Sequence, residues 1–463
     1  MITLVGAGPV GSLWALLLKQ KGFDVQVFEK RPDPRLNTHL AGRSINLIIT
    51  SRGIYGLEKA GLMSLVDKIS VPVFGRMIHS KTGELTYQAY GQKNECNYSV
   101  SRAEINNSLI TEAEKAGVKF YFAHDLQHLD LPNKSLTFQC GNETVKTKYE
   151  ILFGSDGSGS QLRKQLVQLF PTVKDETHWL EADYKELTLP LNAEGKPQLK
   201  TDALHIWPRG AHMMMALANR DGSFTVTVYL PKNNNETKSE WGFNKLTGPD
   251  SVKQLFASEF SDAIAMMPNY LNEFSNNPQG HLGTVRCNHW VFENSIALMG
   301  DAAHAIVPFF GQGMNCGFED CTALLELFEK NPHNWPVILS EYERTQKPNA
   351  DAIADMALEN WVEMKEKVGD SRFLLRKKIE SALEQKYPNV FKARYGLITY
   401  TLTPYSLAQK AGLVQNEIID SLMAEAASLE DVSWTKAEQL IESKWMNFVR
   451  QNSLDIKVYP KKD

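Results

Sequence analysis

Cysteine is scarce in this sequence. The chain has five cysteines among 463 residues, and no two of them form a Cys-x-x-Cys pair. So sparse and odd a set excludes a dense disulfide framework and favours free thiols in a reducing compartment. We therefore expect a cytoplasmic protein without a metal centre.

An excess of charge of either sign is also absent. Lys and Arg number 50 against 54 Asp and Glu, which gives a formal net charge of −4. This balance offers no electrostatic basis for nucleic acid or an anionic membrane as a partner.

Long hydrophobic runs are missing as well. No stretch reaches the ~20 apolar residues that a membrane-spanning helix needs. The apolar run Leu13–Leu18 has no basic segment before it, which disfavours a signal peptide. Trp434–Arg450 has helical periodicity, and we expect a helix packed on the protein body rather than a membrane anchor.

The chain opens with the pattern of a βαβ unit. Ile2–Val5 and Val25–Phe28 are short apolar runs typical of strands, and Val10–Lys21 between them has helical periodicity. A second helix is predicted over Ser101–Ala116, followed by a strand over Val118–Phe122.

The middle of the chain changes to an alternating pattern. Apolar residues alternate with polar ones in Leu204–Trp207, His212–Leu217 and Ser223–Leu230, and glycine-containing turns separate these runs. The pattern predicts an antiparallel meander.

The rest of the chain is predicted to be mostly helical. Ile296–Met299 is one more apolar strand. After Asn315 helical patterns dominate to the end, except near Leu397–Leu402. The fold class is therefore α/β, with a nucleotide-binding domain, an inserted antiparallel β-sheet domain and a helical C-terminal region.

A glycine-rich turn follows the first predicted strand. Gly6, Gly8 and Gly11 fit the pattern GxGxxG, which allows a tight turn, a close approach of backbone to a pyrophosphate, and close packing of helix on strand. Glu29 ends the next strand, where a carboxylate accepts hydrogen bonds from a ribose. Its charge would repel a 2′-phosphate, so FAD or NAD is expected rather than NADP. A glycine-rich turn without a ligand is the alternative.

A second motif joins Gly300–His304 to the glycine-rich stretch Pro308–Asn315. Asp301 at the end of a strand can hold a sugar-alcohol hydroxyl. The glycines before the following helix direct backbone N–H groups and the helix dipole at whatever lies across them. For a flavin this is the edge where negative charge develops on reduction. We expect His304 to be a packed histidine rather than a base.

A third glycine-broken element, Phe153–Ser160, follows a strand and precedes Arg163. An ordinary Asp-Gly turn is the alternative here. The three elements, in this order, resemble the flavin monooxygenases with the para-hydroxybenzoate-hydroxylase fold. In that family the middle element serves both FAD and transiently bound NAD(P)H. No second complete dinucleotide fingerprint is present, as this class implies.

Within that class the sequence is most similar to the kynurenine 3-monooxygenase family. The similarity runs from residue 1 to about residue 405, and six segments carry it: Arg31–Arg35, Gly42–Leu47, Gly75–Met77, Ala203–Pro208, Pro308–Asn315 and Met356–Met364. The mitochondrial members end in a hydrophobic anchor that this sequence lacks, so the resemblance implies a soluble, bacterial-type enzyme.

The resemblance implies three domains and a set of site residues. A discontinuous FAD-binding domain is expected over 1–70, 100–178 and 280–375, a β-sheet substrate domain over 71–99 and 179–279, and a mainly helical region over 376–463. The substrate carboxylate would be held by Arg76, Tyr90, Asn360 and Tyr395, with Phe309 and Glu363 as further substrate contacts. The FAD contacts would be Gly6, Gly8, Val10, Gly11, Glu29, Lys30, Arg31, Arg102, Leu126, Asp301, Gly313, Met314 and Asn315. A solvated helix glutamate is the alternative for Glu363.

The implied reaction is hydroxylation of L-kynurenine to 3-hydroxykynurenine with non-covalent FAD, NADPH and O₂, through a flavin C4a-hydroperoxide. No acid or base is assigned, because the aniline nitrogen already activates the ring. The alternatives are a hydroxylase of another aromatic acid and a non-catalytic binder on a flavoprotein fold. Sequence does not decide the oligomeric state, for which a homodimer is one possibility.

Overall fold

The structure is a computed structural model that describes residues 1–36, 46–237, 239–367 and 371–460. The stretch Gly42–Ile45, part of one of the six similar segments, lies outside the described residues. Backbone contacts divide the chain into two compact units. The first unit comprises Met1–Ile69, Val100–Trp179 and Gly283–Ala354, and the second comprises Ser70–Ser99, Leu180–Leu282 and Asp355–Asp463. The three-domain division remains a prediction.

A six-stranded sheet forms the centre of the first unit, in the order β18-β19-β12-β1-β2-β8. All neighbouring strands are parallel except the edge pair of β18 with β19. Its strands are β1 (Ile2–Val5), β2 (Val25–Phe28), β8 (Lys119–Tyr121), β12 (Ile151–Gly154), β18 (Val291–Phe292) and β19 (Ile296–Leu298). Every residue of β1, β2 and β12 is buried, as expected for a parallel sheet covered on both faces. The predicted βαβ opening is confirmed.

Helices pack around this sheet, and α1 contacts both α4 and α11. The helical elements are α1 (Pro9–Gln20), α2 (Ser51–Lys59), α3 (Met63–Ile69), α4 (Arg102–Lys115), α5 (Gln161–Leu169), α10 (Asp301–His304), the 3₁₀ turn η2 (Pro308–Phe310), α11 (Gly313–Lys330) and the first part of α12 (Trp335–Val362). Ser101 begins α4 as predicted, because its side chain accepts a hydrogen bond from the N–H of Glu104.

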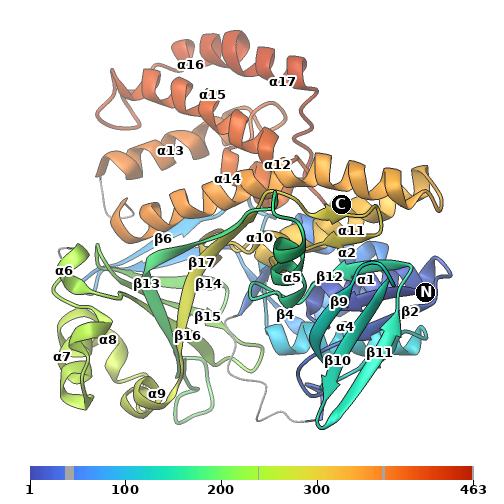
Figure 1. Cartoon of the computed structure of the whole chain (residues 1–463). Coiled ribbons are helices and arrows are strands. Elements are labelled where there is room, and N and C mark those ends of the chain that lie inside the picture. The colour runs from blue at the N-terminus through green and yellow to red at the C-terminus, as the bar shows by residue number, and fades with distance from the viewer. Residues whose placement is uncertain (37–45, 238, 368–370, 461–463) are drawn as a thin grey trace. The chain divides into compact units, whose positions relative to one another are not determined.

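A separate three-stranded antiparallel sheet belongs to the same unit (Figure 1). It consists of β9 (Asp125–Asp130), β10 (Ser135–Cys140) and β11 (Glu143–Lys148), and β3 (Leu47–Ile49) is a further short strand of the unit. The β9–β11 sheet was not predicted from the sequence. Strand β11 is polar along most of its length and has no continuous apolar face.

The second unit contains most of a seven-stranded sheet in the order β17-β13-β16-β15-β14-β5-β6, because the division between the units falls within β13 and β17. Its strands are β5 (Gly75–His79), β6 (Leu85–Ala89), β13 (Asp175–Leu189), β14 (Ala203–Pro208), β15 (Met213–Ala218), β16 (Phe224–Pro231) and β17 (Gln279–Cys287), and β4 (Ser70–Val73) and β7 (Asn97–Val100) lie outside it. Strands β14, β15 and β16 pair antiparallel in succession, which confirms the predicted meander. Strand β5 joins β14 in parallel.

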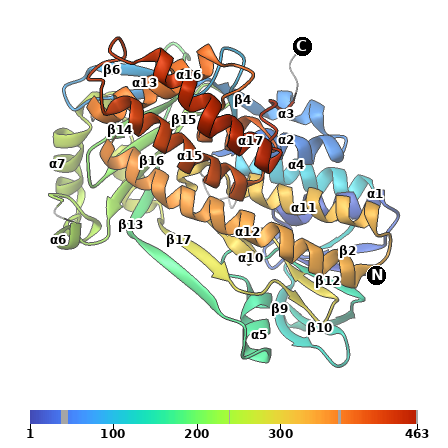
Figure 2. The same cartoon turned by 90° about the horizontal axis from the view of Figure 1, so that it is seen from above.

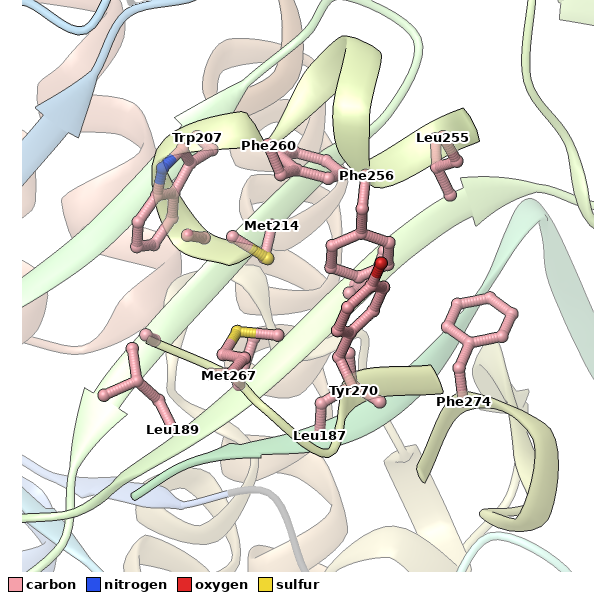
Figure 3. Close-up of a cluster of buried hydrophobic side chains, with 14 of the residues drawn as sticks. Leu187, Leu189, Trp207, Met214, Leu255, Phe256, Phe260, Met267, Tyr270 and Phe274 are labelled. Atoms are coloured by element: carbon pink, nitrogen blue, oxygen red, sulfur yellow. The ribbon is translucent and has the colours of Figure 1, made fainter. Parts of the chain in front are cut away.

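An aromatic core lies between this sheet and three short helices. Phe256 and Phe274 from the helices, and Phe260 from the junction of α7 and α8, share one buried cluster with Trp207 and Met214 of the sheet (Figure 3). The run Met213–Met215 therefore contributes to the sheet core. The helices are α7 (Pro249–Glu259), α8 (Ser261–Ile264) and α9 (Tyr270–Asn276), preceded by α6 (Asn234–Thr237) and the 3₁₀ turn η1 (Phe243–Lys245).

The C-terminal part of the second unit is helical (Figure 2). After α12 come a π-helical segment η3 (Glu363–Lys367), α13 (Ser371–Lys386), α14 (Arg394–Tyr400), α15 (Tyr405–Met423), α16 (Trp434–Leu440), a second π-helical segment η4 (Ile441–Trp445) and α17 (Met446–Asn452). Trp445 is fully buried and donates a hydrogen bond to the carbonyl of Val390. Among the residues that the structure describes, no helix is long and apolar enough to cross a membrane.

The break in helical structure predicted near Leu397–Leu402 exists, but it begins later in the chain than expected. Gly396–Tyr400 is helical and buried on all sides, and the chain leaves the helix only at Thr401. Periodicity alone cannot assign a short, continuously apolar run with β-branched residues to a strand or to a buried helix. This ambiguity is the reason why the position of the break was misjudged.

Two buried histidines of the second unit form a hydrogen-bonded chain. His79 lies 3.2 Å from the carboxylate of Asp262 through Nδ1 and 2.8 Å from Nδ1 of His205 through Nε2. Nε2 of His205 lies 2.9 Å from the carbonyl oxygen of Lys200. Because both ends of the chain are acceptors, it needs one proton more than two neutral imidazoles carry. Burial lowers the pKa of His205 to about 4, so the His205 ring is neutral near neutral pH.

The pKa of His205 makes stability depend on pH. It is about 4 in the folded protein against an ordinary value of 6.5, so between these values the unfolded chain binds more protons. Stability that is present above pH 6.5 is therefore lost as the pH falls toward 4, by roughly 3 kcal/mol. His205→Gln, whose amide can serve both hydrogen-bond partners, should flatten this dependence when urea unfolding is measured across the window. An equally steep dependence in the variant would contradict the assignment.

Candidate functional site

The carboxyl ends of four parallel strands meet at one edge of the first unit's sheet. Val5 pairs with both Phe28 and Gly154, and Gly154 pairs with Leu298. The three motifs singled out in the sequence lie at these strand ends: one starts at Gly6, one includes Gly154, and one starts at Gly300. Ligands of open α/β sheets bind outside the carboxyl ends of the strands, so this edge is a candidate site.

The turn after β1 has a backbone that requires glycine. Gly6 has φ +105°, and a Cβ there would lie 2.4 Å from the carbonyl oxygen of Ser155. A Cβ on Gly11 would lie 2.2 Å from the carbonyl oxygen of Gly6. A Cβ on Gly8 would instead meet open space. The turn is therefore packed on its inner side and open at Gly8, beside the N-terminus of α1, as a phosphate-binding loop requires.

Glu29 is fixed at the end of β2 by backbone contacts. Its two carboxylate oxygens accept hydrogen bonds from the N–H groups of Ala7 (2.9 Å) and Arg31 (3.0 Å). Each oxygen retains acceptor capacity, so the carboxylate can also receive sugar hydroxyls. Lys30 and Arg31 follow it and are exposed.

The Gly300–Asp301 turn rests on a buried ion pair. Asp320 accepts hydrogen bonds from the N–H of Gly300 (2.7 Å) and from Nε2 of His304 (2.8 Å). Burial alone would lower the pKa of His304, but Asp320 outweighs it and holds this pKa well above its usual value. His304 is thus a packed, charged partner of Asp320, in agreement with the sequence analysis, and Asp301 is half-buried at the start of α10.

Asn315 holds the second glycine-rich loop in place. Its side-chain amide donates to the carbonyls of Ile48 (2.7 Å) and Gly311 (2.9 Å), and its oxygen accepts from the N–H of Thr50 (2.9 Å). Because these contacts occupy the side chain, any contact of Asn315 with a flavin would use its backbone N–H in the first turn of α11. Gly313 and Met314 lie in the same turn, and Phe309 is buried in the loop before it.

The middle motif has a clear structural role. Asp156 accepts hydrogen bonds from the N–H groups of Gln161 and Leu162 at the start of α5. Arg163 is 3% exposed and donates to the carbonyls of Ser158 and Ala302, both at 2.7 Å. This arginine therefore ties the middle motif to α10. Three further predicted cofactor residues lie elsewhere on the first unit: Val10 in α1, Arg102 exposed at the start of α4, and Leu126 buried in β9.

A second cluster lies in the second unit, around Arg76 of β5. Nε of Arg76 donates to Oε1 of Gln88, its partner on β6, at 2.8 Å. A terminal nitrogen of the guanidinium lies 3.6 Å from Glu363, which is also 3.9 Å from Lys377. The side chain of Arg76 is 12% exposed. Because Gln88 orients the guanidinium, its outer nitrogens can bind a carboxylate.

Two tyrosines stand beside this arginine. The rings of Tyr90 and Tyr395 stack with centroids 5.4 Å apart, and Asn97 donates to the Tyr395 hydroxyl at 3.0 Å. Burial raises the pKa of both phenols, and the charge of Arg76 acts on both in the opposite sense. Both therefore stay protonated near neutral pH and can donate hydrogen bonds. Asn360 lies one helical turn before Glu363.

The structure thus brings together Arg76, Tyr90, Tyr395 and Glu363, which the sequence analysis named as substrate residues. It adds Gln88 and Asn97, which orient Arg76 and Tyr395. Gln88 could have been found only from the register of β5 with β6, and Asn97 carries no signal in the sequence that sets it apart.

The chain is similar to known proteins over nearly its full length. Residues 1–357 match the family described as FAD binding domain. The kynurenine 3-monooxygenase of Myxococcus xanthus is 40% identical, over 98% of this chain and 97% of its own length. That of Cytophaga hutchinsonii is 42% identical over 91% and 94%, and that of Dictyostelium discoideum is 39% identical over 96% and 98%.

Solved structures with a similar fold are more distant in sequence. A 2-methyl-3-hydroxypyridine-5-carboxylic acid oxygenase has a TM-score of 0.63 at 19% identity, over 81% of this chain and 95% of that one. Pseudomonas aeruginosa PqsL has a TM-score of 0.62 at 18% identity, over 79% and 96%. At these identities the likeness establishes the fold alone.

Asp301→Ala should weaken FAD binding, because the sugar-alcohol chain would lose a charged acceptor. Such a hydrogen bond contributes about 1.5–3 kcal/mol, so the Kd for FAD should rise roughly 10- to 150-fold. Quenching of flavin fluorescence on titration of the apoprotein measures this value. Asp24→Ala, which removes an exposed acid of the same unit, serves as the control. Equal affinities in the two variants would count against Asp301 as a flavin contact.

Proposed function

This chain belongs to the kynurenine 3-monooxygenase family, and we propose that the cluster around Arg76 is where it holds its substrate. The family's reaction is the FAD-dependent hydroxylation of L-kynurenine to 3-hydroxykynurenine with NADPH and O₂. The observation that carries the proposal is the pairing of a nearly buried guanidinium with two protonated phenols within one unit.

L-Kynurenine offers an α-carboxylate, an α-ammonium group and an aromatic amine. The carboxylate suits the fork of Arg76, which Gln88 orients from the neighbouring strand. The phenols of Tyr90 and Tyr395 can donate to the same carboxylate. Asn360 and Glu363 are the further substrate contacts that we propose. The 3.6 Å between Arg76 and Glu363 is longer than a hydrogen bond, so a substrate carboxylate can compete with Glu363 for the guanidinium.

The residues at the edge of the first unit's sheet fit FAD. The open space at Gly8 and the N-terminus of α1 suit the pyrophosphate, and Glu29 is placed for a ribose. We propose that Asp301 holds the ribityl chain and that the first turn of α11, with Gly313, Met314 and Asn315, faces the flavin ring. Val10, Lys30, Arg31, Arg102, Leu126 and Phe309 remain proposed contacts of the cofactor or substrate.

FAD, once reduced by NADPH, supplies the oxygen chemistry, and the protein binds, orients and excludes water. We assign no acid or base, since the aniline nitrogen of kynurenine activates its own ring. The phenols of Tyr90 and Tyr395, whose pKa values burial raises, act as hydrogen-bond donors rather than bases. The cytoplasmic location and a homodimer stay predictions.

A hydroxylase of another aromatic acid is the second candidate. A substrate such as salicylate has a carboxylate for Arg76, but it has no ammonium group for Glu363. Binding of L-kynurenine and of salicylate, compared at the same protein concentration, separates the two candidates.

Arg76→Ala should raise the Kd for L-kynurenine, because a desolvated carboxylate would lose its bidentate partner. Removal of one member of such a pair costs about 2–5 kcal/mol, which corresponds to roughly 30-fold to several thousandfold in Kd. FAD content should stay normal. Arg76→Lys should restore binding only in part, since an ammonium group cannot reproduce the fork. Calorimetric titration measures the Kd.

Arg376→Ala is the control for this experiment. Arg376 belongs to the same unit and is paired with Asp420 in the C-terminal helices. This variant should bind L-kynurenine like the wild type. If Arg76→Ala also binds within about twofold of the wild type, a factor far below the charge-pair estimate, then the carboxylate is held elsewhere.

A further inference from the structure

A cluster of three buried ionisable side chains lies next to Tyr400, whose ring contacts Tyr395. Lys392, Glu95 and Glu384 are exposed by 5%, 7% and 8%. Nζ of Lys392 donates to Glu95 and lies 5.7 Å from the centre of the Tyr400 ring, which packs edge-on against Tyr395. The cluster is outside the set of residues that would touch the substrate.

Glu95 fixes the turn that follows Tyr90. Its carboxylate accepts a hydrogen bond from the N–H of Gln92 at 2.9 Å, and its own N–H donates to the carbonyl of Gln92 at 2.9 Å. A Cβ on Gly91 would lie 2.3 Å from the Glu95 carboxylate and 2.6 Å from the Tyr400 ring. The backbone at Gly91 is therefore packed tightly between the Glu95 carboxylate and the Tyr400 ring.

Lys392 and its neighbours fix the start of α14, where Tyr395 is the second residue. Glu384 accepts a hydrogen bond from the N–H of Ala393 at 2.6 Å. Gln415 donates to the carbonyl of Lys392 at 2.7 Å and accepts from the N–H of Arg394 at 2.8 Å. The first backbone groups of α14 are thus held by buried side chains of α13 and α15.

Besides the ring stacking and the hydrogen bond from Asn97 to Tyr395, two further contacts join the segment of Tyr90 to the segment of Tyr395. One is the ion pair of Glu95 with Lys392, and the other is the hydrogen bond from Gln92 to Glu384 at 3.2 Å. Replacement of a buried ion pair by apolar residues is often neutral or stabilising. Stability alone therefore does not explain why these charges are buried. They are explained if their role is to hold two segments that are far apart in the sequence at a fixed distance.

We infer that the Glu95–Lys392 pair, with Glu384, positions Tyr90 against Tyr395 and thereby sets the affinity for the substrate carboxylate. These are positioning residues, because they act through the tyrosines. The inference rests on the proposed function, since it takes the tyrosines as part of the substrate site.

The test removes both members of the pair in the double variant Glu95→Gln/Lys392→Met, so that neither Glu95 nor Lys392 is left facing a partner that has lost its charge. The Kd for L-kynurenine and the KM should each rise about tenfold, with kcat changed less than about threefold. FAD content should be that of the wild type. Lys392→Arg keeps the charge and should restore most of the affinity.

The matched control is Lys81→Met/Glu259→Gln. Glu259 is 6% exposed and pairs with Lys81 at 2.9 Å in the same unit. This variant should change the melting temperature as much as the first one does, while the Kd for L-kynurenine stays at the wild-type value. A wild-type Kd in Glu95→Gln/Lys392→Met, or the same rise in Kd in both double variants, would overturn the inference.

A thermodynamic cycle separates positioning from general damage. If Lys392 acts through the tyrosines, its effect on Kd should shrink when measured in the Tyr90→Phe background. Full additivity would overturn the inference. Should the double variant not fold, Glu95→Asp shortens the acid by one methylene and keeps its charge, and an unchanged Kd there is equally decisive. Absence of L-kynurenine binding in the wild type would instead contradict the proposed function.

Discussion

The parallel pairing of β1 with β2 and β12 determines where the chemistry of the first unit can occur. Because Val5 is in register with Phe28 and Gly154, three turns from distant parts of the sequence open at one edge. The steric limits at Gly6 and Gly11 then leave the turn after β1 open at Gly8. The fourth strand end is that of β19, which pairs with β12. The ion pair of Asp320 with His304 and the buried Arg163 hold the turn of Asp301 after this strand in place.

Buried charge organises the second unit in a comparable way. Arg76 is held by Gln88 and faces Glu363, and the tyrosines next to it are fixed from behind by Glu95 and Lys392. In both units a buried side chain holds a group that is proposed to touch a ligand: Asp320 fixes the turn of Asp301, and Asn97 donates a hydrogen bond to Tyr395. The flavin family performs its chemistry with the cofactor, so such rigid placement is what the protein has to contribute.

Local sequence patterns predicted the parts of the fold that depend on local rules. Glycine spacing and short apolar runs were sufficient for the βαβ opening, and alternation with turn residues was sufficient for β14–β16. The break near Leu397–Leu402 was placed too early, because the apolar run Leu397–Tyr400 fits a buried helix as well as a strand. The substrate residues came from family resemblance. Gln88 was missed because its pairing with Arg76 depends on the register of β5 with β6. Glu95 and Lys392 were missed because a pair across almost 300 residues leaves no periodic signal.

The most direct test of the account is the reaction of the purified protein with L-kynurenine, NADPH and O₂. The account predicts a yellow protein with non-covalent FAD whose NADPH oxidation is stimulated by L-kynurenine and yields 3-hydroxykynurenine, identified by mass spectrometry against an authentic standard. NADPH oxidation that L-kynurenine does not stimulate, or a product hydroxylated at another position, would contradict it.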